Sequence, residues 1–146
     1  MKGKFSMGTT ISVQNYFGAN LSGLMKPIIY CCPAENVYET AVPINLLLSK
    51  KLADFKPNKR TMQLETCFNQ IINQLPDGVT IKDFEVMFNP EYKVDVLKIL
   101  IAACKKKPFS VVWPGSYKDG KLFFAENGYP DFKMFNIDDY DVTCIV

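Results

Sequence analysis

Short apolar runs along this chain alternate with stretches that have helical spacing. Residues 28–32 form a continuous apolar run that stops at a proline, which is typical of a strand buried on both faces of a sheet. Residues 109–113 have the same character and predict a further buried strand, and residues 142–146 predict a last strand. Residues 41–44 predict another, and the proline within them places it at an edge or at a strand start.

Three segments predict amphipathic helices. The first covers 44–55 and ends at a Lys-Pro-Asn sequence, and the second covers 61–75 and ends at a Pro-Asp-Gly turn. The third is expected to begin at Asn-Pro-Glu, residues 89–91, because an N-cap residue, a proline at the first helical position and an acidic side chain all favour a helix start. It should end at the lysines 105–107, whose charge suits the negative end of a helix.

Residues 79–88 predict a strand whose alternating apolar residues lie on one face: Phe84, Val86 and Phe88. Asp83 and Glu85 then share the other face, where two carboxylates would be able to hold a divalent cation or orient a water molecule. The alternative is that they form the solvated side of the strand. We favour this alternative because the positive charge of Lys82 opposes a cation. The sequence therefore predicts no metal site, and Glu85 and Asp83 are only weak catalytic candidates.

Strands that alternate with helices predict an α/β fold with a mainly parallel sheet. After residue 113 three turn signals, Pro-Gly, Asp-Gly and Asn-Gly, separate short pieces such as 122–125. We therefore expect an irregular, aromatic-rich hairpin segment on the C-terminal side. Residues 1–23 contain four glycines and little apolar periodicity, which predicts a loosely ordered arm with one short helix near 13–17. A single α/β domain should follow over 24–146.

Composition narrows the possible functions. The chain has 146 residues, a net charge of +2 and no histidine, so one domain is expected, without a Ser-His-Asp or Cys-His catalytic pair or a histidine-containing zinc site. No pair of cysteines has the C-x-x-C spacing of a zinc or thioredoxin-like site. Each cysteine lies in an apolar stretch, which predicts buried free thiols in a reducing cytosol: Cys31, Cys32, Cys67, Cys104 and Cys144. No signal-peptide pattern and no apolar run of about 20 residues is present. We therefore expect a cytoplasmic protein without membrane contact.

Basic residues are concentrated between positions 50 and 60: Lys50, Lys51, Lys56, Lys59 and Arg60. Arg60 is the single arginine of the chain. Base reading and two-pronged phosphate contacts rely on the planar fork of arginine, so sequence-specific DNA recognition is not supported. Weak contact with a nucleic-acid backbone through Lys50, Lys51, Lys59 and Arg60 stays open as an alternative function.

Aromatic residues are crowded into the C-terminal third of the chain. Most of them should be core. An exposed subset would form a surface for a protein partner, because tyrosine and tryptophan dominate interface energetics. The candidates for this surface are Trp113, Tyr117, Tyr129 and Phe132.

The turn after the strand at 28–32 is where doubly wound proteins bind phosphates. A phosphate-binding loop needs glycines, so that backbone N–H groups surround the phosphate, and a lysine that pairs with its charge. Residues 32–40 contain neither glycine nor lysine but hold two glutamates, which would repel a phosphate. They also leave so little room that the helix facing the anion should be missing or vestigial. We therefore expect no bound nucleotide and no other cofactor.

The sequence from 111 to 132 contains Val-Val-Trp-Pro-Gly-Ser-Tyr, then Asp-Gly-Lys-Leu, then Ala-Glu-Asn-Gly-Tyr-Pro-Asp-Phe. This block resembles the small P-loop protein family of type 3 BREX (bacteriophage exclusion) systems, in which a strand ends in Trp-Pro-Gly before a hairpin. Residues 45–52 and 85–91 are similar to the family segments that open the second helix and that end the Walker B strand. The resemblance covers 26–146 and implies a three-layer P-loop-like fold and a role in phage defence.

The chain departs from this family where nucleotide would be handled. Family members carry a glycine-rich Walker A loop after the first strand, and residues 32–40 have none. The position of the Walker B aspartate falls on Lys82, whose charge opposes Mg²⁺, and only Glu85 remains from that segment. The resemblance therefore implies a degenerate member that keeps the fold and the defence context but has lost the groups that stabilise phosphoryl transfer.

The function that the sequence favours is a non-catalytic interaction subunit of a prokaryotic phage-defence system, with other proteins of that system as partners. One alternative is a nucleotide-binding or nucleotide-hydrolysing protein whose site has moved to Glu85, with Asp83 and a lysine such as Lys82 or Lys59. It is motivated by the gathering of α/β ligands at the carboxyl ends of strands. The binder of DNA backbones is the other alternative.

Overall fold

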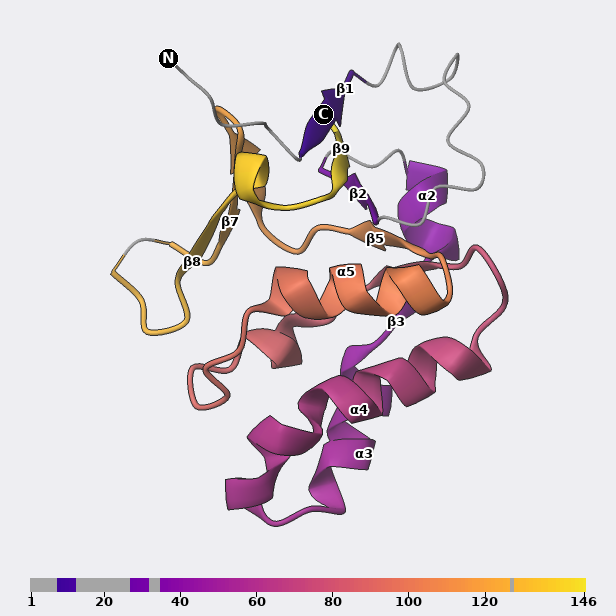
Figure 1. The fold of residues 1–146 in the computed structure, drawn as a ribbon, viewed down its shortest axis with the longest axis vertical. Coiled ribbons are helices and arrows are strands. Elements are labelled where there is room, and N and C mark those ends of the chain that lie inside the picture. Colours follow the sequence, from indigo (N-terminus) through magenta and orange to yellow (C-terminus); the bar gives the residue numbers. More distant parts are fainter. Residues whose placement is uncertain (1–7, 13–26, 32–34, 127) are drawn as a thin grey trace.

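The main sheet of the protein is parallel throughout. The computed structural model describes residues 8–12, 27–31, 35–126 and 128–146. All five strand pairings of the main sheet are parallel. Its six strands lie in the order β1 (Thr9–Ile11), β9 (Thr143–Ile145), β2 (Ile28–Tyr30), β5 (Ser110–Val112), β4 (Thr80–Lys82) and β3 (Val42–Pro43) (Figure 1). The predicted α/β class with a mainly parallel sheet is confirmed.

The middle of the sheet is apolar because its strands are buried on both faces. The Cα atom of Ile29 is in register with Val111 on one side and with Cys144 on the other, and Val111 is in register with Ile81. All four side chains are fully buried. A continuous apolar run is the pattern expected for such strands, and it explains why 28–32 and 109–113 were predictable.

Four helices lie in the described ranges: α2 (Glu35–Thr40), α3 (Asn45–Ala53), α4 (Arg60–Gln74) and α5 (Val96–Lys106). In Figure 1, α3 and α4 lie side by side at the β3 end of the sheet, away from β1 and β9. The buried stripe of α4 has helical spacing: Leu64, Cys67, Phe68, Ile71 and Ile72. The predicted helices at 44–55 and 61–75 are therefore confirmed to within two residues at each end.

The strand predicted over 79–88 is shorter than expected. It ends at Lys82, because Asp83 turns into the left-handed region with φ 52°. The carbonyl of Asp83 then accepts hydrogen bonds from the backbone N–H groups of Ile44 and Asn45. The next residues form a short 3₁₀ helix, η2 (Glu85–Phe88). The prediction that apolar residues up to Phe88 share one strand face is therefore wrong.

The start of the third helix was also placed too early. Asn89 caps a turn instead, in which its side-chain oxygen accepts from the N–H of Glu91 and its carbonyl accepts from the N–H of Tyr92. The helix α5 begins at Val96, with Asp95 as the N-cap that accepts from the N–H of Lys98 at 3.1 Å. Asparagine followed by proline serves turns as well as helix starts, so the residues alone did not distinguish the two.

A second, antiparallel sheet carries the aromatic-rich segment. Its strands are β6 (Ser116–Lys118), β7 (Lys121–Phe124) and β8 (Lys133–Asn136), with β7 in the middle. The Asp119-Gly120 pair has positive φ angles of 52° and 78°, as a tight hairpin turn requires. The predicted hairpin segment is therefore confirmed, with its strand one residue earlier than the expected 122–125.

The N-terminal arm contributes a strand that the sequence did not predict. Strand β1 lies within the expected arm 1–23 and pairs with β9. The short helix expected near 13–17 lies outside the described residues. Two further 3₁₀ turns complete the described elements, η1 (Pro57–Lys59) and η3 (Ile137–Asp139).

The segment after η3 is tied to α5 by a hydrogen bond between side chains. The hydroxyl group of Tyr140 donates to Oδ2 of Asp95 at 2.7 Å, while Oδ1 of Asp95 caps the helix. Burial, and then the hydrogen bond to Asp95, raise the pKa of the Tyr140 phenol. The neutral phenol is therefore favoured in the folded state.

Replacing Tyr140 with phenylalanine is expected to lower the free energy of unfolding by about 1 kcal/mol near neutral pH, because the hydrogen bond to Asp95 is lost. The advantage of the wild-type protein should shrink as the pH rises above the ordinary phenol pKa of 10.0, since only the unfolded phenol then ionises. Urea unfolding of both proteins at about pH 8 and about pH 11 measures this. A difference that is the same at both pH values would contradict it.

Candidate functional site

A pocket lies at the carboxyl edge of the main sheet, beside the ends of β4 and β5. Parallel strands bring their carboxyl ends to one edge, and ligands of open α/β sheets bind there. The pocket has a volume of about 260 Å³. The described residues that line it are Tyr38, Lys82, Asp83, Glu85, Val112, Trp113, Pro114 and Gly115. Three charged residues noted in the sequence therefore line one pocket: Lys82, Asp83 and Glu85.

Lys82 is held by α2. Its Nζ atom donates to the carbonyl oxygen of Tyr38 at 2.8 Å and lies 4.0 Å from the centroid of the Tyr38 ring. The last carbonyls of a helix lack partners within it and attract positive charge, so this contact stabilises the end of α2 against β4. The ammonium group is thus occupied by protein contacts. The sequence predicted a missing or vestigial helix after β2, and the structure has one of six residues there, α2.

Asp83 and Glu85 line one pocket but do not share a strand face as predicted. Asp83 follows the end of β4, and Glu85 opens η2. The carboxylate of Glu85 is exposed and accepts from Nδ2 of Asn45 at 3.0 Å, while Oδ1 of Asn45 accepts from the N–H of Val86 at 2.9 Å. Asn45 therefore fastens η2 to the start of α3. Sequence reasoning missed this role, because it depends on a contact between distant segments.

Metal binding would need a group of ligands among the described residues, and thiol chemistry would need a reactive cysteine thiol. Nowhere in the described ranges do three or more His, Cys, Asp or Glu side chains group as a metal site would require. Cys67, Cys104 and Cys144 are buried free thiols, Cys31 is only partly buried rather than buried as predicted, and Cys32 lies outside the described residues. Burial raises the pKa of the Cys67 and Cys104 thiols, which disfavours the nucleophilic thiolate.

Two residues of the Trp-Pro-Gly sequence, Trp113 and Gly115, pack against the backbone carbonyl group of Phe123. The indole Nε1 of Trp113 donates to the carbonyl oxygen of Phe123 at 2.9 Å. Gly115 approaches the same oxygen so closely that a Cβ atom there would lie 1.8 Å from it. The motif therefore joins the end of β5 to β7 and forms one wall of the pocket. The signal for this was the motif itself, but the partner carbonyl was not predictable from sequence.

The four aromatic interface candidates have different environments. The side chain of Trp113 is only 4% exposed, so it belongs to the core rather than to a surface. Tyr117 and Phe132 are partly buried, with the Tyr117 hydroxyl accepting from the N–H of Gly120 and the Phe132 ring against that of Phe123. Tyr129 is 60% exposed. Of the four, Tyr129 offers the most surface to a partner.

The basic candidates lie away from this pocket, on α3, η1 and α4. Lys50 and Lys59 are exposed, and Nζ of Lys51 donates to Oε1 of Gln70 at 3.4 Å. Nε of Arg60 donates to the carbonyl oxygens of Leu52 and Phe55 at 3.0 and 3.1 Å. The structure therefore brings these four residues to one end of the molecule, with Arg60 engaged at the end of α3.

Comparison with known proteins finds no match to this chain among family models, curated proteins or solved structures. In the part of the chain that the structure describes, no helix has the length and apolar character needed to span a membrane.

Proposed function

We propose that this protein is a non-catalytic, P-loop-like interaction subunit of a prokaryotic phage-defence system of the BREX kind. The proposal that the protein is non-catalytic rests on the position and the hydrogen bond of Lys82. A P-loop enzyme needs an acidic group at the end of this strand to hold Mg²⁺ through water. Here a lysine stands there, and its ammonium group is bound to the carbonyl of Tyr38.

The strand order supports the P-loop-like part of the proposal. After β2 the chain crosses to β3, which lies at one edge of the sheet. Strand β9 pairs with β2 on its opposite side. The carboxyl end of β2 is thus a point where connections diverge, which is where an α/β sheet opens a crevice for phosphates. Residues 32–40, which follow this point, contain no glycine or lysine and carry two glutamates. The scaffold is compatible with nucleotide, while its loop sequence is not.

Titration with ATP and Mg²⁺ tests the non-catalytic half. Isothermal calorimetry should show no heat of specific binding, and the melting temperature should not rise, because a ligand that binds only the folded state stabilises it. A dissociation constant in the micromolar range would overturn this half of the proposal. The free nucleoside adenosine serves as the control for binding that does not involve phosphate.

The relocated site around Glu85 is a second candidate, favoured by the meeting of Asp83 and Glu85 in one pocket. If nucleotide does raise the melting temperature, the variant Glu85→Gln tests whether the nucleotide binds at the pocket around Glu85. Loss of the shift in this variant would support the relocated site. An unchanged shift would exclude Glu85 from it.

The partner surface is proposed around the β7–β8 connection. Tyr129 in this connection and Met134 on the edge strand β8 are 60% and 52% exposed, and Figure 1 shows the connection at the periphery of the molecule. An edge strand presents unpaired backbone groups beside these apolar side chains. Both features suit a protein partner.

Co-purification with the other proteins of a candidate defence system tests this surface. The double variant Tyr129→Ala/Met134→Lys is expected to reduce the retained partner about tenfold or more, because interface energy is concentrated in few aromatic and apolar anchors. Met62→Ala is the matched control, since Met62 on α4 is 71% exposed but lies on another element. Equal loss in both variants, or none in either, would contradict the proposed surface.

A further inference from the structure

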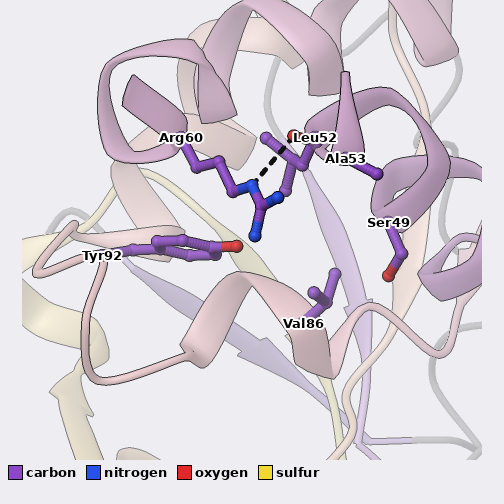
Figure 2. A pocket seen from close by; sticks show the side chains of 6 residues that line it. All are labelled: Ser49, Leu52, Ala53, Arg60, Val86 and Tyr92. Carbon is purple, nitrogen blue, oxygen red and sulfur yellow. Dashed lines mark hydrogen bonds between the residues drawn. The ribbon is translucent and has the colours of Figure 1, made fainter. Parts of the chain in front are cut away.

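A second pocket lies between the α3–α4 pair on one side and η2 with the turn that follows it on the other. It has a volume of about 140 Å³, and Figure 2 shows the described residues around it. Leu52, Ala53, Val86 and the ring of Tyr92 supply apolar walls, and Ser49 lies at its edge. Arg60 is the only charged residue among those that line it. This pocket plays no part in the function proposed above.

The orientation of Arg60 is fixed by backbone contacts. Its Nε atom donates to the carbonyl oxygens of Leu52, in the last turn of α3, and of Phe55, just after that helix. These contacts use one edge of the guanidinium group. Figure 2 shows the other end pointing into the pocket, toward Val86 and the hydroxyl group of Tyr92. The guanidinium group is therefore preorganised, with one terminal nitrogen directed at the cavity and the other beside Leu52.

The hydroxyl group of Tyr92 complements this guanidinium group. Tyr92 is 8% exposed, so almost all of the side chain is packed, yet its hydroxyl group faces the pocket beside the guanidinium group. A phenol and a guanidinium group both donate hydrogen bonds. Two kinds of donor and one positive charge thus converge on a small cavity whose other walls are apolar.

We propose that this pocket binds a carboxylate group carried by an aliphatic chain. One terminal nitrogen of Arg60 and the hydroxyl group of Tyr92 are placed to donate one hydrogen bond each to the two oxygens of a carboxylate. The apolar walls formed by Leu52 and Val86 suit the carbon atoms behind the carboxylate. One arginine balances a single negative charge, whereas a phosphate dianion would remain half neutralised by the lining residues. The surrounding stretch 50–60 has five basic residues and one acidic residue, which favours the approach of an anion.

The source of the carboxylate is either a small organic acid or the free carboxyl end of a peptide. The chemistry at the guanidinium group is the same in both cases. Butyrate is the probe for the small acid. A short peptide with an apolar last residue, compared with its C-terminal amide, is the probe for the peptide end.

Arg60 gives this proposal a direct spectroscopic test, because it is the only arginine in the chain. Its Nε–H group is a single arginine signal in the proton–nitrogen NMR spectrum, and butyrate at millimolar concentrations should shift it in a saturable way. Tyr92→Phe keeps Arg60 in place and should weaken binding about tenfold, as expected for a hydrogen bond to a charged group. Lys59→Gln removes a neighbouring exposed charge and should change the affinity by less than about twofold.

Several results would overturn the proposal. These are the absence of a saturable shift with both butyrate and the free-acid peptide, an affinity unchanged in Tyr92→Phe, and tighter binding of inorganic phosphate than of butyrate. If the free-acid peptide binds more tightly than butyrate while its amide does not bind, the carboxylate comes from a peptide end. Equal affinities for butyrate and the free-acid peptide assign the pocket to small acids. Either of these two outcomes supports the site.

Discussion

Replacing Gly115 with alanine is expected to destabilise the protein by about 3 kcal/mol, although this residue is exposed. A Cβ atom would lie 1.8 Å from the carbonyl oxygen of Phe123, and backbone on both sides of this contact would have to move. The same carbonyl accepts the indole N–H of Trp113. Moving it therefore also strains the partly buried hydrogen bond that joins the end of β5 to β7.

Chemical unfolding by urea, followed by tryptophan fluorescence, measures this loss, since Trp113 is the single tryptophan. Gly78→Ala is the matched control. Gly78 has a positive φ of 72° but open space around it, so its replacement should cost only about 1 kcal/mol of backbone strain. If both variants lose the same stability, the close approach to Phe123 is not the reason that glycine stands at 115.

Replacing Phe88 with alanine should cost about 4 kcal/mol, the range for a fully buried aromatic residue. The ring of Phe88 stacks on that of Phe124 at 4.0 Å between centroids and meets the edges of Trp113 and Phe135. It is 1% exposed. Since it belongs to η2, its loss removes the ring contacts of that turn with Phe124 and Phe135 of the antiparallel sheet.

Hydrogen exchange distinguishes this local effect from general loss of core. In Phe88→Ala, amides of β7 should lose protection beyond the global decrease in stability. Phe68→Ala, at an equally buried position on α4, should lower the exchange protection of all protected amides by the same amount. A double-mutant cycle between Phe88→Leu and Phe124→Leu should give a coupling of about 1 kcal/mol for the stacked pair. Zero coupling would contradict the role assigned to this stack.

The fold was predictable wherever a local pattern also determines the tertiary role. The central residues of strands such as β2 and β5 are apolar because they are buried in the sheet, and α4 has a buried apolar stripe with helical spacing. Residues 83–95 were not predictable in this way. Their path depends on the positive φ of Asp83 and on contacts to Ile44 and Asn45, which lie far away in the sequence.

The candidate site was predictable only in part. Charged residues near the end of β4 indicated its place, because the carboxyl edge of a parallel sheet follows from topology. The engagement of Lys82 by Tyr38 was not indicated, since it joins segments 44 residues apart. Arg60 was noticed as the single arginine, but the cavity beside it arises from packing between α3 and the turn around Tyr92.

The position of β9 affects when the sheet can form during synthesis. This strand inserts between β1 and β2, which both precede it by more than a hundred residues in the chain. A ribosome must therefore translate past Ile145 before β2 acquires its second neighbour. Until then the nascent chain exposes an unpaired, apolar strand edge, which is a surface that chaperones and aggregation both recognise.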